Sequence, residues 1–317
     1  MTGRPAPTVA EVSEALLAVH RDTDGATKER ITFRSWTPHS ERKQRQRLFV
    51  ESTLDGTPRY VAKVPLDEQD GMVQREWQIL SGLRGLDTLR PRAVRRLGRG
   101  FVMTYVAAVD FPDRMAAASP AAWPELLGDA LELAATVHRS APASTSVTAI
   151  DVAAAYLPDL DRLPGSALAG LDGAAVGPAH GDLGPWNLRV DGRGRISLID
   201  WEDYQPTGLP ALDVLNVVHT AALIAHPDYR ERGFGWLFEQ VFHGTGAFRL
   251  AVDQALDRYA RLTGADSAAI MRLTPLFCHW MIRRIRNQGR PADHLFFRPF
   301  AEHYEAETPE WRVDSRV

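Results

Sequence analysis

The sequence predicts an α+β protein of two parts, a small one with an antiparallel β-sheet plus a helix and a larger, mostly helical one. Runs rich in β-branched and aromatic residues fill much of residues 31–106, whereas apolar residues at helical spacing dominate from residue 124 onward. The 317 residues, 44% hydrophobic and 24% charged, are enough for two cores. We therefore expect an N-terminal part of residues 1–106 and a C-terminal part of residues 107–317.

The N-terminal part is expected to begin with an amphipathic helix over residues 7–20. Strand-like runs follow at 31–36, 47–53 and 59–64, a second helix at 71–83, and two last strands at 92–97 and 100–106. Short turns containing Gly or Pro join neighbouring runs, which favours antiparallel pairing. The sequence therefore predicts one antiparallel sheet with two helices beside it.

Lys63 interrupts an otherwise apolar strand, Val-Ala-Lys-Val at residues 61–64. The helix expected over residues 71–83 carries Glu76 within its apolar arc, and a carboxylate that faces a core is costly unless it is paired. We therefore predict a Lys63–Glu76 ion pair. The alternative is an edge-strand lysine whose amine reaches water.

The segment 180–187, His-Gly-Asp-Leu-Gly-Pro-Trp-Asn, carries the most chemistry. After Asn187, two short apolar runs flank a turn with two glycines, which indicates a β-hairpin. Antiparallel pairing brings Asn187, before the first strand, opposite Asp200, after the second. An amide oxygen and a carboxylate side by side suit Mg²⁺, and Asp182 lies upstream as a candidate base. The alternative is that Asp182 caps a turn and Asp200 only ends a strand.

This order of residues is similar to the catalytic loop and metal-binding pair of protein-kinase-like phosphotransferases. Gly181 stands where protein kinases have an arginine, and Ile-Asp-Trp-Glu at residues 199–202 stands where they have Asp-Phe-Gly. Both features resemble the aminoglycoside phosphotransferase and choline kinase branch, whose members phosphorylate small molecules. The resemblance covers about residues 28–220 and implies a two-lobed protein-kinase-like fold.

The resemblance also implies roles for the polar residues. Asp182 would be the catalytic base, and Asn187 and Asp200 would hold Mg²⁺. Lys63 would contact the nucleotide phosphates, and Glu76 would hold Lys63. The nucleotide would be ATP or GTP, since the resemblance does not separate them.

Two further stretches would belong to the nucleotide site by the same resemblance. One is similar to the kinase hinge, whose backbone groups bind the adenine: Met103, Thr104, Tyr105 and Val106. The other, residues 38–44, stands where a glycine-rich phosphate loop is expected, yet it contains no glycine. Either Ser40, Arg42 or Lys43 replaces the loop amides with a side chain, or the turn is merely solvated.

Other polar residues of the C-terminal part have weaker patterns. Asp213, in a helix expected from residue 208, resembles the buried aspartate that braces the catalytic loop; the alternative is an aspartate favoured by the helix dipole. His138 ends a helix expected over 124–139 and should pack or cap rather than react. Four arginines cluster at one helix end and are expected on a solvated face: Arg283, Arg284, Arg286 and Arg290.

The remaining C-terminal chain is expected to be helical. Residues 141–177 have the composition of an insertion with short helical pieces before the catalytic loop. The expected later helices span residues 214–225, 234–248, 251–263, 267–287 and 299–305.

Composition excludes several classes of partner. With 37 basic and 40 acidic residues the formal net charge is -3, which offers no electrostatic attraction to nucleic acid or an anionic membrane. No apolar run approaches the ~18 residues of a membrane span, and the first residues lack the apolar stretch of a signal peptide. The single Cys278 cannot form an internal disulfide, which fits a reducing cytoplasm. We expect a cytoplasmic protein; the sequence does not fix its oligomeric state.

The sequence thus predicts an enzyme that transfers the γ-phosphoryl group of ATP to a hydroxyl group of a small molecule, with Mg²⁺. The alternative is a pseudokinase that only binds a nucleotide or ligand, which the missing glycine loop favours. A protein kinase is a weaker alternative, because Gly181 replaces the arginine and no Ala-Pro-Glu segment follows Asp200. The sequence does not distinguish among five classes of acceptor: aminoglycosides, macrolides, sugars, choline-like amines and biosynthetic intermediates. The 14 acidic residues against 13 arginines in residues 203–317 favour a neutral acceptor over a polycation.

Overall fold

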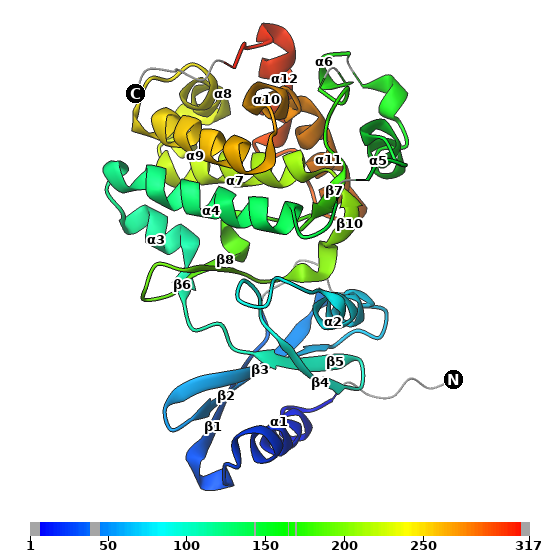
Figure 1. The fold of residues 1–317 in the computed structure, drawn as a ribbon, viewed down its shortest axis with the longest axis vertical. Helices are drawn as coiled ribbons and strands as arrows, with labels where there is room; N and C mark the ends of the chain where they lie inside the picture. Colours follow the sequence, from blue (N-terminus) through cyan, green and yellow to red (C-terminus); the bar gives the residue numbers. More distant parts are fainter. Residues whose placement is uncertain (1–6, 39–44, 143, 164, 169, 312–317) are drawn as a thin grey trace. The chain divides into compact units, whose positions relative to one another are not determined.

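The computed structural model describes residues 7–38, 45–142, 144–163, 165–168 and 170–311, and the chain divides into two compact units. Unit 1 comprises Met1–Ala108 together with Ile199–Glu202, and unit 2 comprises Val109–Leu198 and Asp203–Val317. The short segment Ile199–Glu202 thus belongs to unit 1, although unit 2 precedes and follows it in the sequence. Figure 1 shows the elements of both units.

Unit 1 is built on an antiparallel sheet in the order β1-β2-β3-β5-β4. Its strands are β1 (Ile31–Trp36), β2 (Arg47–Leu54), β3 (Thr57–Pro65), β4 (Ala93–Leu97) and β5 (Gly100–Thr104). β2 and β3 are joined by Asp55 and Gly56, both with positive φ, which is the backbone that a tight two-residue hairpin needs. The predicted antiparallel sheet is confirmed, and its strand ends differ from the predicted ones by at most two residues.

The two faces of this sheet have different neighbours. α1 (Val9–Asp24) covers one face, where Tyr60, Ala62 and Val64 of β3 join its apolar residues in a buried core. α2 (Met72–Gly82) lies on the other side of the sheet (Figure 1). Since side chains alternate along a strand, Lys63 points away from α1 and towards α2. The alternation therefore directs the one lysine of β3 to the helix that carries Glu76.

Unit 2 is mostly helical. Its helices are α3 (Phe111–Ala117), α4 (Trp123–His138), α5 (Ala149–Tyr156), α6 (Gly165–Leu168), α7 (Pro210–Ala225), α8 (Tyr229–Phe242), α9 (Ala247–Thr263), α10 (Ser267–Arg272), α11 (Thr274–Asn287) and α12 (Phe297–Glu307). α4, α7 and α9 pack against one another (Figure 1). α7 is apolar and buried through most of its length, as expected of a helix that others surround.

Short strands of unit 2 flank the segment 180–187. β6 (Val109–Asp110), β8 (Leu188–Val190) and β9 (Ile196–Leu198) form one sheet, and β7 (Gly177–Ala179) pairs with β10 (Gln205–Gly208). β8 and β9 are the predicted hairpin, with Leu188 opposite Leu198. Within the described residues, no helix is both long and apolar enough to cross a bilayer.

Two of the predicted C-terminal helices are wrong in extent. The helix expected over 267–287 is divided at Leu273 into α10 and α11, because Pro275 lies in the first turn of α11 and a proline does not fit a helix interior. The helix expected over 234–248 follows a break in α8 at Gly233, where φ is 84°, and it ends at Phe242 rather than at residue 248. Gly244 and Gly246 follow it, and the next helix begins at Ala247.

His219, in the middle of α7, makes the stability of the folded protein depend on pH. The ring is wholly buried among phenylalanine rings and shares a hydrogen bond with Thr274 (Nε2 to Oγ1, 3.1 Å). Burial lowers the pKa of His219 to about 3. Between this value and the pKa of about 6.5 in an unfolded chain, the unfolded state binds more protons. The free energy of unfolding therefore falls as the pH drops, with a slope of at most about 1.4 kcal/mol per pH unit.

We expect His219→Gln to flatten this dependence between about pH 6.5 and pH 5, because glutamine does not titrate. Urea unfolding at several pH values measures the slope. His294→Gln, at an exposed histidine, is the control and should keep the wild-type slope. An unchanged slope in His219→Gln would show that another group titrates on unfolding.

Candidate active site

In unit 1 the ammonium group of Lys63 contacts three carboxylates. Nζ lies 2.6 Å from Glu76 Oε2, 2.7 Å from Asp200 Oδ1 and 3.3 Å from Glu202 Oε2. The predicted ion pair between Lys63 and Glu76 is confirmed. The contacts with Asp200 and Glu202 were not predicted, because they depend on the return of the segment Ile199–Glu202 to unit 1.

The backbone of this segment is fixed on the same cluster. Asp200 has a φ of 63°, a left-handed conformation that is uncommon outside glycine. The next N–H group, of Trp201, donates to Glu76 Oε1 over 3.1 Å, and the Trp201 side chain is fully buried. Glu76 thus holds Lys63 with one carboxylate oxygen and the chain beside Asp200 with the other.

The charges of this cluster explain the shifted pKa values. Burial lowers the pKa of Lys63, but the three carboxylates outweigh burial and raise it overall. Burial raises the pKa of Glu76, and Asp200 and Glu202 act in the same direction against Lys63. One ammonium group therefore does not neutralise three carboxylates, although Arg47 also contacts Glu202 (Nη1 to Oε2, 2.6 Å).

The donor atoms of this cluster fit a hard divalent cation. Oxygen atoms of Glu76, Asp200 and Glu202 lie within 4.8 Å of one another. Mg²⁺ prefers oxygen ligands and usually takes one or two carboxylates, with phosphate and water completing its shell. Asp200 is the most exposed of the three carboxylates, at 35% of its side chain, and is therefore the one accessible to such an ion.

In unit 2 the segment 180–187 is held by Asp213, a residue of the first turn of α7 that is 2% exposed. Its Oδ2 accepts the N–H of His180 (2.6 Å), and its Oδ1 accepts the N–H of Gly181 (3.0 Å). Burial raises the pKa of Asp213, but the hydrogen bonds from His138 and the amide, with both histidine charges, outweigh burial and lower it. The predicted bracing of the loop by Asp213 is confirmed.

Gly181 is required by the backbone at this point. Its φ is 80°, and an added Cβ would lie 2.3 Å from the carbonyl oxygen of Asp203. Any side chain would both strain the backbone and collide with a main-chain atom. The absence of the protein-kinase arginine at this position therefore follows from local geometry.

Asp182 and Asn187 are connected across the loop. Asn187 Nδ2 donates to the backbone carbonyl oxygen of Asp182 over 2.8 Å. The amide nitrogen of Asn187 is thereby turned towards the loop, so Oδ1 is the atom it would offer to a cation. Asn187 directly precedes the Leu188–Leu198 pair of the hairpin, and Asp200 follows Leu198 by two residues.

Arg284 of α11 contacts Asp182, which the sequence prediction missed. Nη1 lies 2.8 Å from Asp182 Oδ1 and 3.2 Å from the carbonyl oxygen of Gly181, and Nη2 lies 2.6 Å from Asp203 Oδ2. The expected solvated face is therefore wrong for Arg284, whose side chain is 18% exposed, whereas Arg283 is 43% exposed. A signal was present, because Arg284 follows the buried Trp280 by one helical turn.

The other predicted residues of the nucleotide site lie in or after β5. Met103 and Thr104 end the strand opposite Val61 and Tyr60, and the N–H of Tyr105 donates to the carbonyl oxygen of Arg59 (2.8 Å). All four residues of the predicted hinge are half-buried: Met103, Thr104, Tyr105 and Val106. Three predicted candidates lie outside the described residues: Ser40, Arg42 and Lys43.

The chain is similar to known proteins both in sequence pattern and in fold. The family described as the phosphotransferase enzyme family matches residues 35–250. None of the curated proteins matches the chain in sequence.

Three solved structures indicate the fold. The choline kinase LicA from Streptococcus pneumoniae has a TM-score of 0.53 and 13% identity, with 92% of this chain and 96% of that chain covered. The macrolide 2'-phosphotransferase MphH from Brachybacterium faecium has a TM-score of 0.50 and 17% identity, with 94% and 100% covered. The streptomycin–ATP ternary complex of the aminoglycoside phosphotransferase APH(2")-IIa has a TM-score of 0.50 and 16% identity, with 89% and 93% covered. The predicted kinase-like fold is confirmed.

Proposed function

Because the chain belongs to the phosphotransferase enzyme family, we propose that it transfers the γ-phosphoryl group of ATP to a hydroxyl group of a small molecule. The observation that carries this proposal is the fixed position of Asp182. Asp213 holds the amides of its loop, Asn187 holds its carbonyl oxygen and Arg284 holds its carboxylate. Phosphotransfer enzymes need a carboxylate held in place, because positioning supplies much of their rate.

The proposed step follows from the two oxygens of this carboxylate. Oδ1 of Asp182 stays bonded to Arg284, so Oδ2 accepts the proton of the acceptor hydroxyl. The acceptor oxygen forms a bond to the γ-phosphorus while the bond from that phosphorus to the oxygen of ADP breaks, and ADP leaves. The carboxylate thereby orients the hydroxyl throughout the transfer.

We assign the nucleotide phosphates to Lys63, held by Glu76, and the metal to Asp200 and Asn187. Lys63 stays charged beside its three carboxylates, as a phosphate ligand must. When bound, Mg²⁺ would neutralise the charge of the nucleotide phosphates. The adenine would bind at the backbone of residues 103–106. ATP is the first choice because the similar aminoglycoside phosphotransferase is described with ATP, and GTP is compared in the same assay.

The acceptor in this proposal is neutral or weakly charged, such as a sugar or a glycosylated metabolite. The guanidinium group of Arg284 is paired with both Asp182 and Asp203, so it neutralises part of the negative charge beside the base carboxylate. A polycationic acceptor, which clustered unpaired carboxylates would favour, gains little from such a paired group. The balance of 14 acidic residues against 13 arginines in residues 203–317 supports the same choice.

One observation favours the alternative, a module that binds nucleotide without transferring phosphate. Asp182 is ion-paired with Arg284, so one oxygen of its carboxylate is already occupied. Phosphoryl transfer through a loose transition state depends more on orientation than on base strength, so the ion pair is compatible with catalysis.

The proposal is tested by incubating the protein with MgATP or MgGTP and a panel of neutral sugars, macrolides and aminoglycosides. ADP release and a mass gain of one phosphoryl group in the acceptor are measured at low and moderate salt. We expect a neutral glycoside as the acceptor, with turnover insensitive to salt. Salt-sensitive turnover of the polycations alone would overturn the acceptor class. Nucleotide binding without transfer to any member of the panel would favour the binding module.

Arg284→Gln is expected to lower kcat by about 10- to 100-fold, because the carboxylate of Asp182 loses its fixed position. The KM for the nucleotide should not change, since Arg284 contacts Asp182, Gly181 and Asp203 rather than the Lys63 cluster. Steady-state kinetics separates the two constants. Arg284→Lys should restore part of the loss, because an ammonium group can replace one of the two ion pairs.

The neighbouring Arg283→Gln is the matched control. Arg283 lies on the same helix, its side chain is 43% exposed, and its ion-pair partner among the described residues is Asp159, at 3.7 Å. It should keep the wild-type kcat. Equal losses in both variants would show that the helix, and not the contact with Asp182, is what the substitutions disturb.

A further inference from the structure

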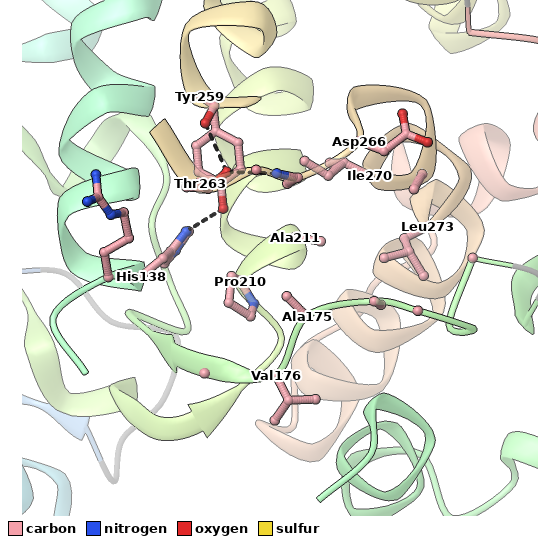
Figure 2. Close-up of a pocket in the computed structure, with 18 of the residues that line it drawn as sticks. His138, Ala175, Val176, Pro210, Ala211, Tyr259, Thr263, Asp266, Ile270 and Leu273 are labelled. Atoms are coloured by element: carbon pink, nitrogen blue, oxygen red, sulfur yellow. Dashed lines mark hydrogen bonds between the residues drawn. The ribbon is translucent and has the colours of Figure 1, made fainter. Parts of the chain in front are cut away.

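Unit 2 contains a cavity of about 780 Å³ (Figure 2) that includes no residue of the segment 180–187 in its lining. Its wall comes from the end of α4, the chain before β7, the start of α7, the end of α9 and from α10. The volume is within the range of small-molecule sites, about 300–1,000 Å³. Asp182 does not line this cavity, so a substrate bound in it would not present its hydroxyl group to Asp182. The acceptor site proposed above therefore does not explain the cavity.

The wall is mostly apolar and made of small residues. Val176, Pro210, Ile270 and Leu273 are buried aliphatic or ring side chains of the lining. Alanines and glycines supply much of the remainder; Figure 2 shows Ala175 and Ala211 beside the open space. Small side chains leave flat surfaces, which suit the faces of a ring system.

The charged residues of the cavity wall do not favour a charged ligand. Asp266 already caps α10 through the N–H of Ala268 (2.8 Å) and lies 3.7 Å from Arg272. Arg139 also lines the cavity and is exposed. Because the lining holds one carboxylate and one guanidinium group, both of residues that are exposed, a charge buried inside the cavity would be uncompensated.

One end of the cavity offers a hydrogen-bond acceptor. The Tyr259 hydroxyl lies 2.8 Å from His138 Nδ1, and His138 Nε2 lies 3.2 Å from Asp213 Oδ2 (Figure 2 shows the first contact). Nε2 of His138 donates to the carboxylate of Asp213, and the Tyr259 hydroxyl, whose oxygen has two lone pairs, shares a hydrogen bond with Nδ1. The hydroxyl oxygen of Tyr259 then keeps the capacity to accept from an N–H or O–H group of a ligand.

The same contacts connect the cavity wall to the catalytic loop. Asp213 shares a hydrogen bond with His138, and it also accepts hydrogen bonds from the backbone N–H groups of His180 and Gly181. A ligand that moves Tyr259 or His138 therefore acts, through one carboxylate, on the backbone that carries Asp182. This is a continuous chain of hydrogen bonds between two separate sites, as coupling between them needs.

We propose that this cavity binds a neutral small molecule with an apolar ring body and one hydrogen-bond donor, and that its occupation orders the catalytic loop through Tyr259, His138 and Asp213. The binding is independent of the proposed phosphotransfer. Only the resulting change in turnover rests on that function, and the experiment below measures binding and loop order without turnover.

The probe is N-phenyl-naphthylamine, a neutral fluorescent ring compound with one N–H group. Anilinonaphthalene sulfonate, with the same rings and an added negative charge, is compared with it. We expect saturable binding of one molecule of the neutral dye per chain, and affinity for the sulfonate that is lower by about tenfold or more. Equal affinity for both dyes would overturn the neutral ligand class.

Two neighbouring positions of α10 give a matched pair of variants. Ala269 lines the cavity and Ala268 does not. Ala269→Phe should fill the space and weaken the neutral dye by about tenfold or more, whereas Ala268→Phe should bind it like the wild type. Ala175→Trp, at an exposed lining position, provides a second block if Ala269→Phe does not fold. Wild-type affinity in a folded blocking variant would overturn the site.

Hydrogen exchange of the peptide over residues 177–184 tests the connection to the catalytic loop. Saturation with the neutral dye should slow exchange of the His180 and Gly181 amides in the wild type. Tyr259→Phe removes only the hydroxyl, so the dye should still bind but exchange should not change. Binding to the wild type without any change in loop exchange would overturn the coupling, whatever the result of the turnover assay.

Discussion

Asp182→Asn is expected to lower kcat by about 10²- to 10⁴-fold, while the fold and the nucleotide affinity stay unchanged. Asparagine has the same shape as aspartate, and its carbonyl oxygen can still accept the hydrogen bond from Arg284 that Oδ1 accepts in the wild type. What it loses is the charge that attracts the acceptor proton. Single-turnover kinetics with saturating MgATP isolates this step from product release.

Asp203→Asn is the control for this substitution. Asp203 shares Arg284 with Asp182 (Nη2 to Oδ2, 2.6 Å) but has no role in proton transfer in our proposal. Its loss of kcat should therefore be much smaller, since Arg284 keeps its contact with Asp182. Near-wild-type turnover in Asp182→Asn would exclude Asp182 as the base.

Lys63→Met should have the largest effect on stability, about 3–5 kcal/mol, because it removes the cation from three carboxylates in a buried cluster. Lys63 is 3% exposed, and methionine leaves Glu76 and Glu202 buried without its charge. Urea unfolding measures the loss. Lys28→Met, at an exposed lysine, is the control and should cost less than about 0.5 kcal/mol.

The double variant Lys63→Met/Glu76→Gln identifies the cause of that loss. If unpaired charge is the cause, removal of one carboxylate should return part of the stability, so the double variant should be more stable than Lys63→Met alone. The sign of this difference is decisive. A double variant that is less stable by the sum of two independent losses would show that Lys63 and Glu76 contribute separately.

Local patterns were sufficient to predict the parts of the site that lie close together in sequence or on adjoining elements. Strand alternation and a helix arc placed Lys63 with Glu76, and two short apolar runs located the hairpin after Asn187. Asp213 was found only through the family resemblance, since an aspartate in a first helical turn is common for other reasons.

Such local patterns could not predict the contacts of Arg284 and Asp200. Arg284 lies about a hundred residues after Asp182, outside the residues 35–250 that the family matches, and only the packing of α11 brings the two together. Asp200 meets Lys63 through a left-handed backbone at a residue that is not glycine. Periodicity in a sequence does not indicate a left-handed backbone at a residue such as Asp200, because tertiary contacts stabilise that conformation.

The way the chain returns to unit 1 has a consequence for fragments of the protein. The chain passes between the units three times, after Ala108, after Leu198 and after Glu202. A fragment that stops at residue 108 would lack Asp200, Trp201 and Glu202, so Lys63 and Arg47 would lose anionic partners and Glu76 would lose the N–H group of Trp201. Such a fragment is not expected to be an autonomous folding domain, whereas adding a peptide that spans residues 199–202 should complement it. A boundary for expression that is placed after Ala108 would therefore remove a part of unit 1 itself, because the segment Ile199–Glu202 belongs to that unit.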